Sequence, residues 1–169
     1  MSLYAGLALA ALKPGDAAPD FTTQASLAGK PFQFSLAAAL KQGPVVLYFY
    51  PAAFTKGCTI EAHEFAEATA QFEAMDATVI GVSHDNIDTL NKFSVSECRN
   101  KFAVAADPDQ HIMKSYDAVL WLDPKLSNRT SYVISPQGKV LYAYSALSPD
   151  EHVHNTLAAV QAWQAQQPH

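Results

Sequence analysis

Cys58 is the residue whose type and setting favour chemistry most strongly. An apolar run at residues 45–50 ends at Pro51, a short turn follows, and Cys58 then opens a segment with helical spacing of apolar residues. The start of a helix offers unpaired backbone N–H groups and a partial positive charge, and both stabilise a thiolate. Since the thiolate is the nucleophilic form of cysteine, the sequence predicts a sulfur nucleophile at the end of a strand and the start of a helix.

The predicted helix at residues 58–75 carries polar groups on a face that is otherwise apolar. Steps of three and four residues place the following side chains on that face: Cys58, Glu61, Phe65, Ala68, Phe72 and Met75. A carboxylate on an apolar face is costly unless it is paired. The first turn, with its cysteine and its glutamate, is therefore a candidate site rather than ordinary core.

The segment before Cys58 resembles the active-site motif of peroxiredoxins, which are thiol peroxidases on a thioredoxin-like scaffold. The motif Pro-x-x-x-Thr-x-x-Cys runs here from Pro51 through Thr55 to Cys58. The sequence Ala-Pro-Asp-Phe at residues 18–21 resembles the N-terminal signature of the family. The resemblance extends over residues 13–163, which is most of the chain.

The resemblance implies a role for each residue of the motif. Cys58 would attack the peroxide, Thr55 would hydrogen-bond the thiolate and then the peroxide oxygens, and Pro51 would shield the sulfur from water. Arg129 matches the active-site arginine of the family, and its charge would stabilise the thiolate and the leaving oxygen. Glu61 matches a recurrent glutamate and is expected to orient Arg129, because a carboxylate that touched the sulfur would disfavour the thiolate. Each residue also has an interpretation without a catalytic role. Thr55 could cap a turn and Pro51 could simply end a strand. Arg129 could be a solvated loop residue, and Glu61 an ordinary acid in the first turn of the helix.

Cys98 is the other cysteine of the sequence, in a helix predicted at residues 86–102. In some members of the Q-type (bacterioferritin-comigratory) branch the resolving cysteine lies in this helix, so the resemblance implies a disulfide between Cys58 and Cys98. Others carry it five residues after the nucleophile, where this chain has His63. A nucleophile at a helix start and a partner midway along another helix would need local unwinding to reach disulfide distance. The alternative is that Cys98 is a core residue of a one-cysteine peroxidase.

The resemblance implies an enzyme that reduces hydrogen peroxide and organic hydroperoxides without a metal, haem or flavin cofactor. A thioredoxin-like dithiol would reduce the disulfide afterwards. A thiol–disulfide oxidoreductase, a copper chaperone and a non-catalytic redox sensor stay open as alternatives. The first two classes usually carry Cys-x-x-Cys or Cys-x-x-x-Cys, whereas the residue three positions after Cys58 is Glu61.

The composition favours one globular domain. A chain of 169 residues, 49% hydrophobic and 16% charged, can bury a sizeable core. The net charge of −5 and the lack of a basic stripe argue against nucleic acid or a membrane surface as partner, and we expect a monomer or weak dimer. The six histidines are scattered, so no metal site is predicted. His152 and His154, near a predicted helix start, are expected to be solvated.

The beginning of the chain differs from the rest. Residues 3–12 are small and apolar but too few to span a bilayer, and residues 8–10 resemble a signal-peptidase site without a preceding lysine or arginine. We expect residues 1–12 to be an N-terminal tail or the remnant of an export signal, and residues 13–169 to form the peroxidase domain. The cytoplasm and the bacterial periplasm are equally compatible locations.

The order of the predicted elements indicates an α/β sandwich. A hairpin is expected around the turn at residues 27–30, and a capping box at Ser148 and Glu151 starts the last helix. The elements between them are strand 45–50, helix 58–75, strand 78–83, helix 86–102, strand 103–106, helix 109–117 and strands 130–134 and 139–144, followed by helix 149–166. This order predicts a thioredoxin-like fold, with a mixed central sheet flanked by helices and an N-terminal hairpin extension.

Overall fold

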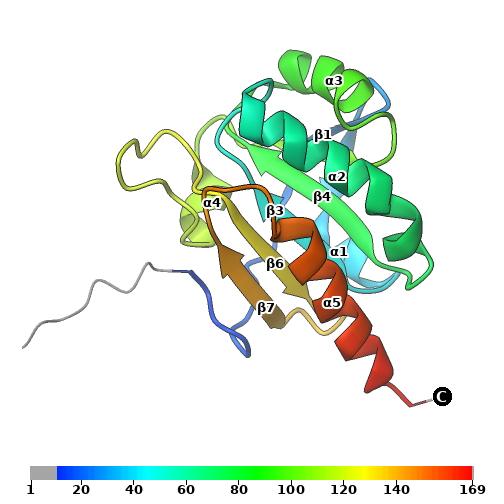
Figure 1. The fold of residues 1–169 in the computed structure, drawn as a ribbon. Helices are drawn as coiled ribbons and strands as arrows, with labels where there is room; N and C mark the ends of the chain where they lie inside the picture. Colours follow the sequence, from blue (N-terminus) through cyan, green and yellow to red (C-terminus); the bar gives the residue numbers. More distant parts are fainter. Residues whose placement is uncertain (1–10, 169) are drawn as a thin grey trace, which may run out of the picture.

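A seven-stranded mixed sheet with helices on both faces forms the centre of the computed structural model, which describes residues 11–168 (Figure 1). The strand order across the sheet is β2-β1-β5-β4-β3-β6-β7. The strands are Thr22–Leu27 (β1), Lys30–Ser35 (β2), Val45–Phe49 (β3), Thr78–Ser83 (β4), Ala103–Ala106 (β5), Thr130–Ile134 (β6) and Val140–Ser145 (β7). The helices are Leu36–Leu40 (α1), Lys56–Glu73 (α2), Ile87–Ser96 (α3), His111–Ser115 (α4) and His152–Ala165 (α5). The predicted thioredoxin-like sandwich is confirmed.

The middle of the sheet is parallel and its two sides are antiparallel. β3 pairs in parallel with β4, and β4 with β5, while the β6–β7 and β1–β2 hairpins extend the two edges. Every residue of β3 is buried, as expected for a strand covered on both faces. The β1–β2 turn has Ala28 and Gly29 at positive φ (52° and 77°), the backbone that a two-residue hairpin turn requires.

Alternating side chains of β3 pack into two separate hydrophobic cores, one on each face of the sheet. Val46 and Tyr48 pack under α2, α3 and α5, which Figure 1 shows together on one face of the sheet. Val45 and Leu47 point to the opposite face, where α1 and α4 cover them. The period of two along the strand thus fixes which residues can reach α2 and the Cys58 side of the molecule.

The helix after β4 is shorter than predicted. α3 ends at Ser96, and the backbone N–H of Cys98 donates to the Phe93 carbonyl at 3.0 Å as the chain turns away. Arg99 and Asn100 follow with φ of 53° and 61°, so they cannot continue the helix. The expectation that Cys98 lies midway along a helix is therefore wrong, since it lies in the turn after the helix.

The last helix also begins later than predicted. α5 starts at His152, with Glu151 as its N-cap residue and no side-chain cap hydrogen bond within the described chain. The Ser148 hydroxyl instead accepts the Asp150 N–H at 3.4 Å, inside the loop before the helix. The predicted capping box at Ser148 is wrong, because the chain needs these residues to turn from β7 to the start of α5.

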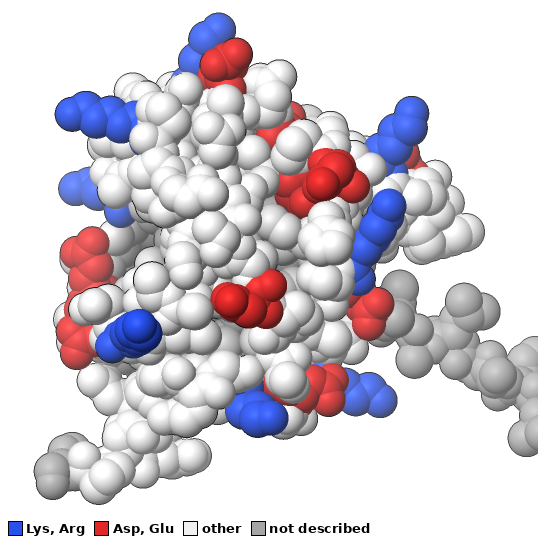
Figure 2. Space-filling view, turned by 180° about the vertical axis from the view of Figure 1, so that it is seen from behind, with Lys and Arg blue, Asp and Glu red and all other residues white. Residues whose placement is uncertain are grey.

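The surface and the start of the chain add two observations. Figure 2 shows lysine, arginine, aspartate and glutamate side chains scattered over one face of the described residues, with no broad patch of one sign. No helix among residues 11–168 combines the length and the apolar character needed to cross a membrane. Of the predicted tail, residues 11 and 12 pack against the core with α1 and α4, and residues 1–10 lie outside the described residues.

Candidate active site

Cys58 is the third residue of α2, with 1% of its surface exposed. The helix begins at Lys56, two residues earlier than predicted, and Thr55 is its N-cap residue. The first backbone bond of the helix runs from the Thr59 N–H to the Thr55 carbonyl at 2.9 Å. The N–H of Cys58 precedes that bond, so the sulfur lies in the turn where unpaired N–H groups and the helix dipole favour negative charge.

Arg129 brings a buried positive charge to this sulfur. It immediately precedes β6, whose first residue, Thr130, pairs with Phe49 at the end of β3, where the chain leaves for the Cys58 turn. Its Nη2 donates to the Cys58 Sγ at 3.5 Å, and its Nε donates to the Leu147 carbonyl at 2.7 Å. With 5% of its surface exposed, Arg129 is held in place rather than solvated.

Glu61 holds the other side of the same guanidinium. Arg129 Nη1 donates to Glu61 Oε1 at 2.9 Å, so the predicted contact between these two residues is present. Glu61 is fully buried, and burial raises the pKa of its carboxyl to about 8 against the opposing effect of Arg129. Its second oxygen, Oε2, has no hydrogen-bond partner among the described residues. The carboxylate thus contacts the same guanidinium that contacts the sulfur.

His152, the first residue of α5, lies against Glu61 and was missed as a site residue. Its Nδ1 is 3.7 Å from Glu61 Oε2 and 2.8 Å from the Ser131 hydroxyl, and its side chain is fully buried. Burial lowers the pKa of its imidazole to about 4. The expectation that His152 is solvated is wrong, while His154 is exposed as expected. The signal was the helical face that His152 shares with the buried Thr156 and Val160.

The turn between β3 and α2 carries the remaining motif residues. The Thr55 hydroxyl donates to the Ala52 carbonyl at 2.8 Å, not to the sulfur as the resemblance implied. Asp85, just after β4, accepts the Ala53 N–H at 2.8 Å and so ties the turn to the neighbouring strand. Pro51, at the strand end, is partly buried. The turn is therefore fixed from outside the motif, by a carboxylate that sequence spacing did not reveal.

Cys98 is fully buried, and burial raises the pKa of its thiol well above the usual range. Both neighbours of Cys98 contact α2. Glu97 Oε2 is 2.6 Å from His63 Nε2, and Arg99 Nη1 is 3.5 Å from Glu67 Oε1. His63 and Glu67 are one helical turn apart, so two adjacent contacts hold the Cys98 segment against the helix that carries Cys58.

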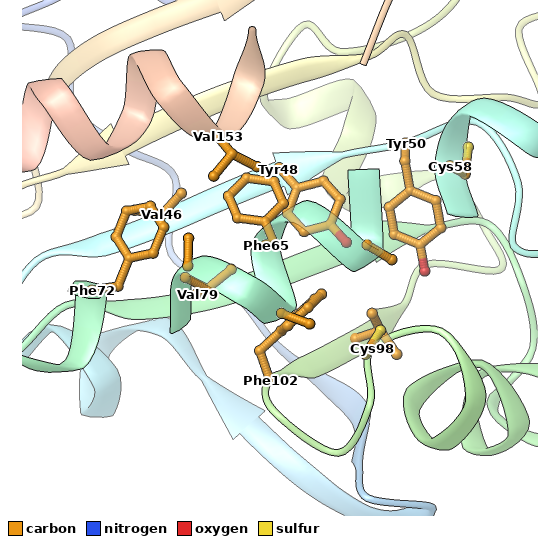
Figure 3. Packing of buried hydrophobic residues seen from close by; sticks show 14 of the residues in the cluster. Val46, Tyr48, Tyr50, Cys58, Phe65, Phe72, Val79, Cys98, Phe102 and Val153 are labelled. Carbon is orange, nitrogen blue, oxygen red and sulfur yellow. The ribbon is translucent and has the colours of Figure 1, made fainter. Parts of the chain in front are cut away.

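The two cysteines belong to one hydrophobic cluster but are not joined. Both are free thiols, and Figure 3 shows both among the packed side chains of this cluster. In that view the ring of Tyr50 lies between them. Burial raises the pKa of the Tyr50 phenol, and negative charge on Cys98 or Cys58 raises it further. The structure thus brings Cys98 to the same region as Cys58, with an aromatic ring in the intervening space.

The fold and this site define the class of the protein. The chain belongs to the AhpC/TSA family, which it matches over residues 14–143. Its curated relatives include a putative peroxiredoxin of Mycobacterium tuberculosis, 34% identical over 154 residues that cover 89% of this chain and 97% of the relative. A chloroplastic peroxiredoxin Q of Oryza sativa subsp. japonica is 32% identical over 149 residues, 88% of this chain. The chain spans 66% of the length of that rice relative.

Solved structures agree with these relatives. The peroxidoxin BcpB of Mycobacterium tuberculosis superposes with a TM-score of 0.77 at 34% identity, covering 89% of this chain and 97% of the other. A peroxiredoxin Q of Xanthomonas campestris gives 0.73 at 27% identity, covering 83% and 90%. The resemblance to peroxiredoxins, and to their Q-type branch, is confirmed.

Proposed function

We propose that this protein is a thiol peroxidase that reduces hydrogen peroxide and organic hydroperoxides, with Cys58 as the nucleophile. The observation that carries the proposal is the buried Arg129 guanidinium, 3.5 Å from a cysteine sulfur in the first turn of a helix. The Arg129 guanidinium and the N–H groups of the helix start both favour the thiolate. The same donors can stabilise the peroxide oxygen that becomes negative as the O–O bond breaks. Membership of the AhpC/TSA family supports this reading.

The peroxide step forms a sulfur–oxygen bond on Cys58 and breaks the O–O bond of the peroxide. The Cys58 thiolate attacks the terminal oxygen of the hydroperoxide, the O–O bond breaks, and the leaving oxygen departs with its electron pair and takes up a proton. The products are a sulfenic acid on Cys58 and an alcohol, or water when the substrate is hydrogen peroxide. In this step Arg129 stabilises the leaving oxygen, and the Thr55 hydroxyl turns from the Ala52 carbonyl to the bound peroxide.

The disulfide step uses Cys98. Its thiol condenses with the sulfenic acid of Cys58, which releases water and forms the disulfide, and a thioredoxin-like dithiol then reduces this bond by exchange. In the reduced protein Cys98 is buried and its neighbours contact α2, so the segment 97–99 has to leave its place first. We propose that this release precedes disulfide formation. The expected monomer or weak dimer stays a prediction.

A one-cysteine peroxidase with a structural Cys98 is the second candidate. The full burial of Cys98 favours it, because free cysteine is among the residues most often found in cores. In that case an external thiol would reduce the sulfenic acid of Cys58 directly. The two candidates share the peroxide step and differ only in the fate of the sulfenic acid.

Peptide mapping after oxidation tests the function and separates the candidates. The reduced protein is mixed with one equivalent of hydrogen peroxide, free thiols are alkylated, and the peptides are identified by mass. We expect consumption of the peroxide and an intramolecular bond between Cys58 and Cys98. An alkylated Cys98 beside an oxidised Cys58 would favour the one-cysteine enzyme, and an unchanged peroxide concentration would contradict both.

A further inference from the structure

Arg129 has two buried partners that can each carry a negative charge. Its Nη2 faces the Cys58 sulfur at 3.5 Å and its Nη1 faces the Glu61 carboxylate at 2.9 Å. Within residues 11–168 it is the one arginine or lysine that pairs with Glu61. A single guanidinium cannot neutralise a thiolate and a carboxylate together, and a net negative charge in a buried site is costly. Ionisation of Cys58 is therefore linked to the protonation state of Glu61.

His152 lies beside the Glu61 oxygen, Oε2, that has no hydrogen-bond partner among the described residues. The Ala146 carbonyl, which can only accept, lies 2.8 Å from Nε2 and fixes a hydrogen on that nitrogen. Nδ1 is therefore the nitrogen that gains or loses a proton, and it faces Glu61 Oε2 at 3.7 Å and the Ser131 hydroxyl at 2.8 Å. The orphan oxygen and this nitrogen together can hold one proton in a fully buried place.

We propose that His152 is a positioning residue for the reaction of Cys58, and that it acts by sharing one proton with Glu61. The proton lies either on Glu61 with a neutral imidazole or on His152 with a carboxylate, and in both states the pair has no net charge. The positive charge of Arg129 is then available to stabilise the Cys58 thiolate. The inference rests on the proposed role of Cys58 as the nucleophile.

The ionisation behaviour of the two groups agrees with this sharing. Burial raises the pKa of Glu61 to about 8 and lowers that of His152 to about 4, so between these values the pair holds one proton, which lies on Glu61 beside a neutral imidazole. Other groups also act on the pair from the surrounding elements, and each of them is kept in the variants below. These groups are Arg129 before β6, Cys58 and Glu64 on α2, Tyr48 on β3 and Tyr144 on β7.

The direct test is His152→Gln, with His154→Gln as the control. Glutamine keeps an amide donor for the Ala146 carbonyl and removes Nδ1, whereas His154 is an exposed histidine on the same helix. The readouts are the pH midpoint of Cys58 alkylation in the Cys98→Ser background and the rate constant for peroxide. Without Nδ1 as acceptor for its proton, the Glu61 carboxyl of His152→Gln should ionise at lower pH and compete for Arg129. We therefore expect the midpoint to rise by about one pH unit and the rate at neutral pH to fall about tenfold, recovering at higher pH. In His154→Gln we expect no change, and an unchanged midpoint in His152→Gln would overturn the proposal.

A double variant separates proton sharing from a structural role. If His152 acts through Glu61, then His152→Gln has no effect once Glu61→Gln has removed the carboxylate. We expect Glu61→Gln and the double variant to share one alkylation midpoint. A further rise of the midpoint in the double variant would show that His152 only supports the packing, and would overturn the proposal.

A measurement on the wild-type chain covers the case in which His152→Gln does not fold. Linkage is reciprocal, so removing the charge of Cys58 must change the titration of Glu61. With Cys58 capped as a neutral methyl disulfide, we expect the carboxyl carbon of Glu61 to titrate at lower pH by nuclear magnetic resonance. An unchanged titration would overturn the proposal. The alkylation midpoint and the titration of Glu61 are both measured without peroxide. Failure of the proposed function would therefore be seen separately, as a Cys58 thiol that alkylates normally but does not reduce peroxide.

Discussion

The Arg129 guanidinium lies 3.5 Å from the Cys58 sulfur, although 71 positions of sequence separate the two residues. The pairing of β6 with β3 produces this approach, because it sets the start of one strand beside the end of the other. The Leu147 carbonyl and Glu61 then hold the guanidinium from two further directions. Chemistry at Cys58 therefore depends on contacts made by β6, the loop before α5 and α2 itself.

Arg129→Ala should slow the peroxide step by about 10²-fold, because it removes a preorganised donor to the leaving oxygen. It also leaves Glu61 buried without its cation, so stability should fall, and more at pH 9 than at pH 6, where the carboxyl keeps its proton. Stopped-flow rates and thermal unfolding measure the two effects. Adding Glu61→Gln should restore the stability but not the rate, and recovery of both would show that Arg129 acts only on the fold.

Gly57→Ala should slow the peroxide step without lowering the melting temperature. A Cβ at this position would meet Arg129 Nη2 at 3.0 Å, so the guanidinium has to shift by a few tenths of an ångström from the sulfur. A misplacement of about 1 Å can cost about 10²-fold in rate, so we expect a smaller loss here, whereas alanine in a helix is about 0.5–1 kcal/mol more favourable than glycine. A rate equal to that of wild type would show that Arg129 need not be held so closely.

Much of the fold was predictable because its signals are local. The apolar run at residues 45–50 and the proline that ends it identify the central strand, and the motif with Cys58 identifies the start of α2. Both depend on residues close together in the sequence. The α/β order then follows from alternating strands and helices, so the sheet and its flanking helices agree with the prediction.

What sequence reasoning missed depends on contacts between distant segments. His152 resembles a solvated histidine beside a helix start, and only the packing of α5 on β6 buries it against Ser131 and Glu61. The turn at Cys98 depends on positive φ at Arg99 and Asn100, and the sequence has no glycine there that would have predicted it. Asp85 holds the Cys58 turn from a neighbouring strand, a relation set by the sheet rather than by spacing.

Glu97→Gln should speed formation of the disulfide without changing the peroxide step. It weakens the 2.6 Å contact with His63, which holds the segment next to Cys98 on α2. Glu67→Gln is the matched control, since its contact with Arg99 is longer and exposed, and such pairs contribute little. The two phases are resolved by quenching with a thiol-blocking reagent at increasing times. Equal rates for wild type and Glu97→Gln would show that this contact does not limit the release of Cys98.

The stability of the protein should fall as the pH rises from about 6.5 to 8. In this range folded Glu61 keeps a proton that the unfolded chain has lost, because its folded pKa is raised from 4.5 to about 8. The folded state binds more protons, so the free energy of unfolding decreases with pH, by at most about 1.4 kcal/mol per unit for one proton. His152, with a folded pKa of about 4, has the opposite effect only below about 6.5. Urea titrations at several pH values should show the decline in wild type and a flatter profile in Glu61→Gln.

The most direct test of the account is the reaction of the Cys98→Ser variant with one equivalent of hydrogen peroxide. The variant retains Cys58 as its one cysteine, and the introduced serine cannot form a disulfide. We predict that one equivalent of peroxide disappears and that a sulfenic acid on Cys58 is trapped by a dimedone probe, with loss of both signals in the variant that also carries Cys58→Ser. Peroxide that remains unconsumed, or is consumed equally without Cys58, would contradict the account.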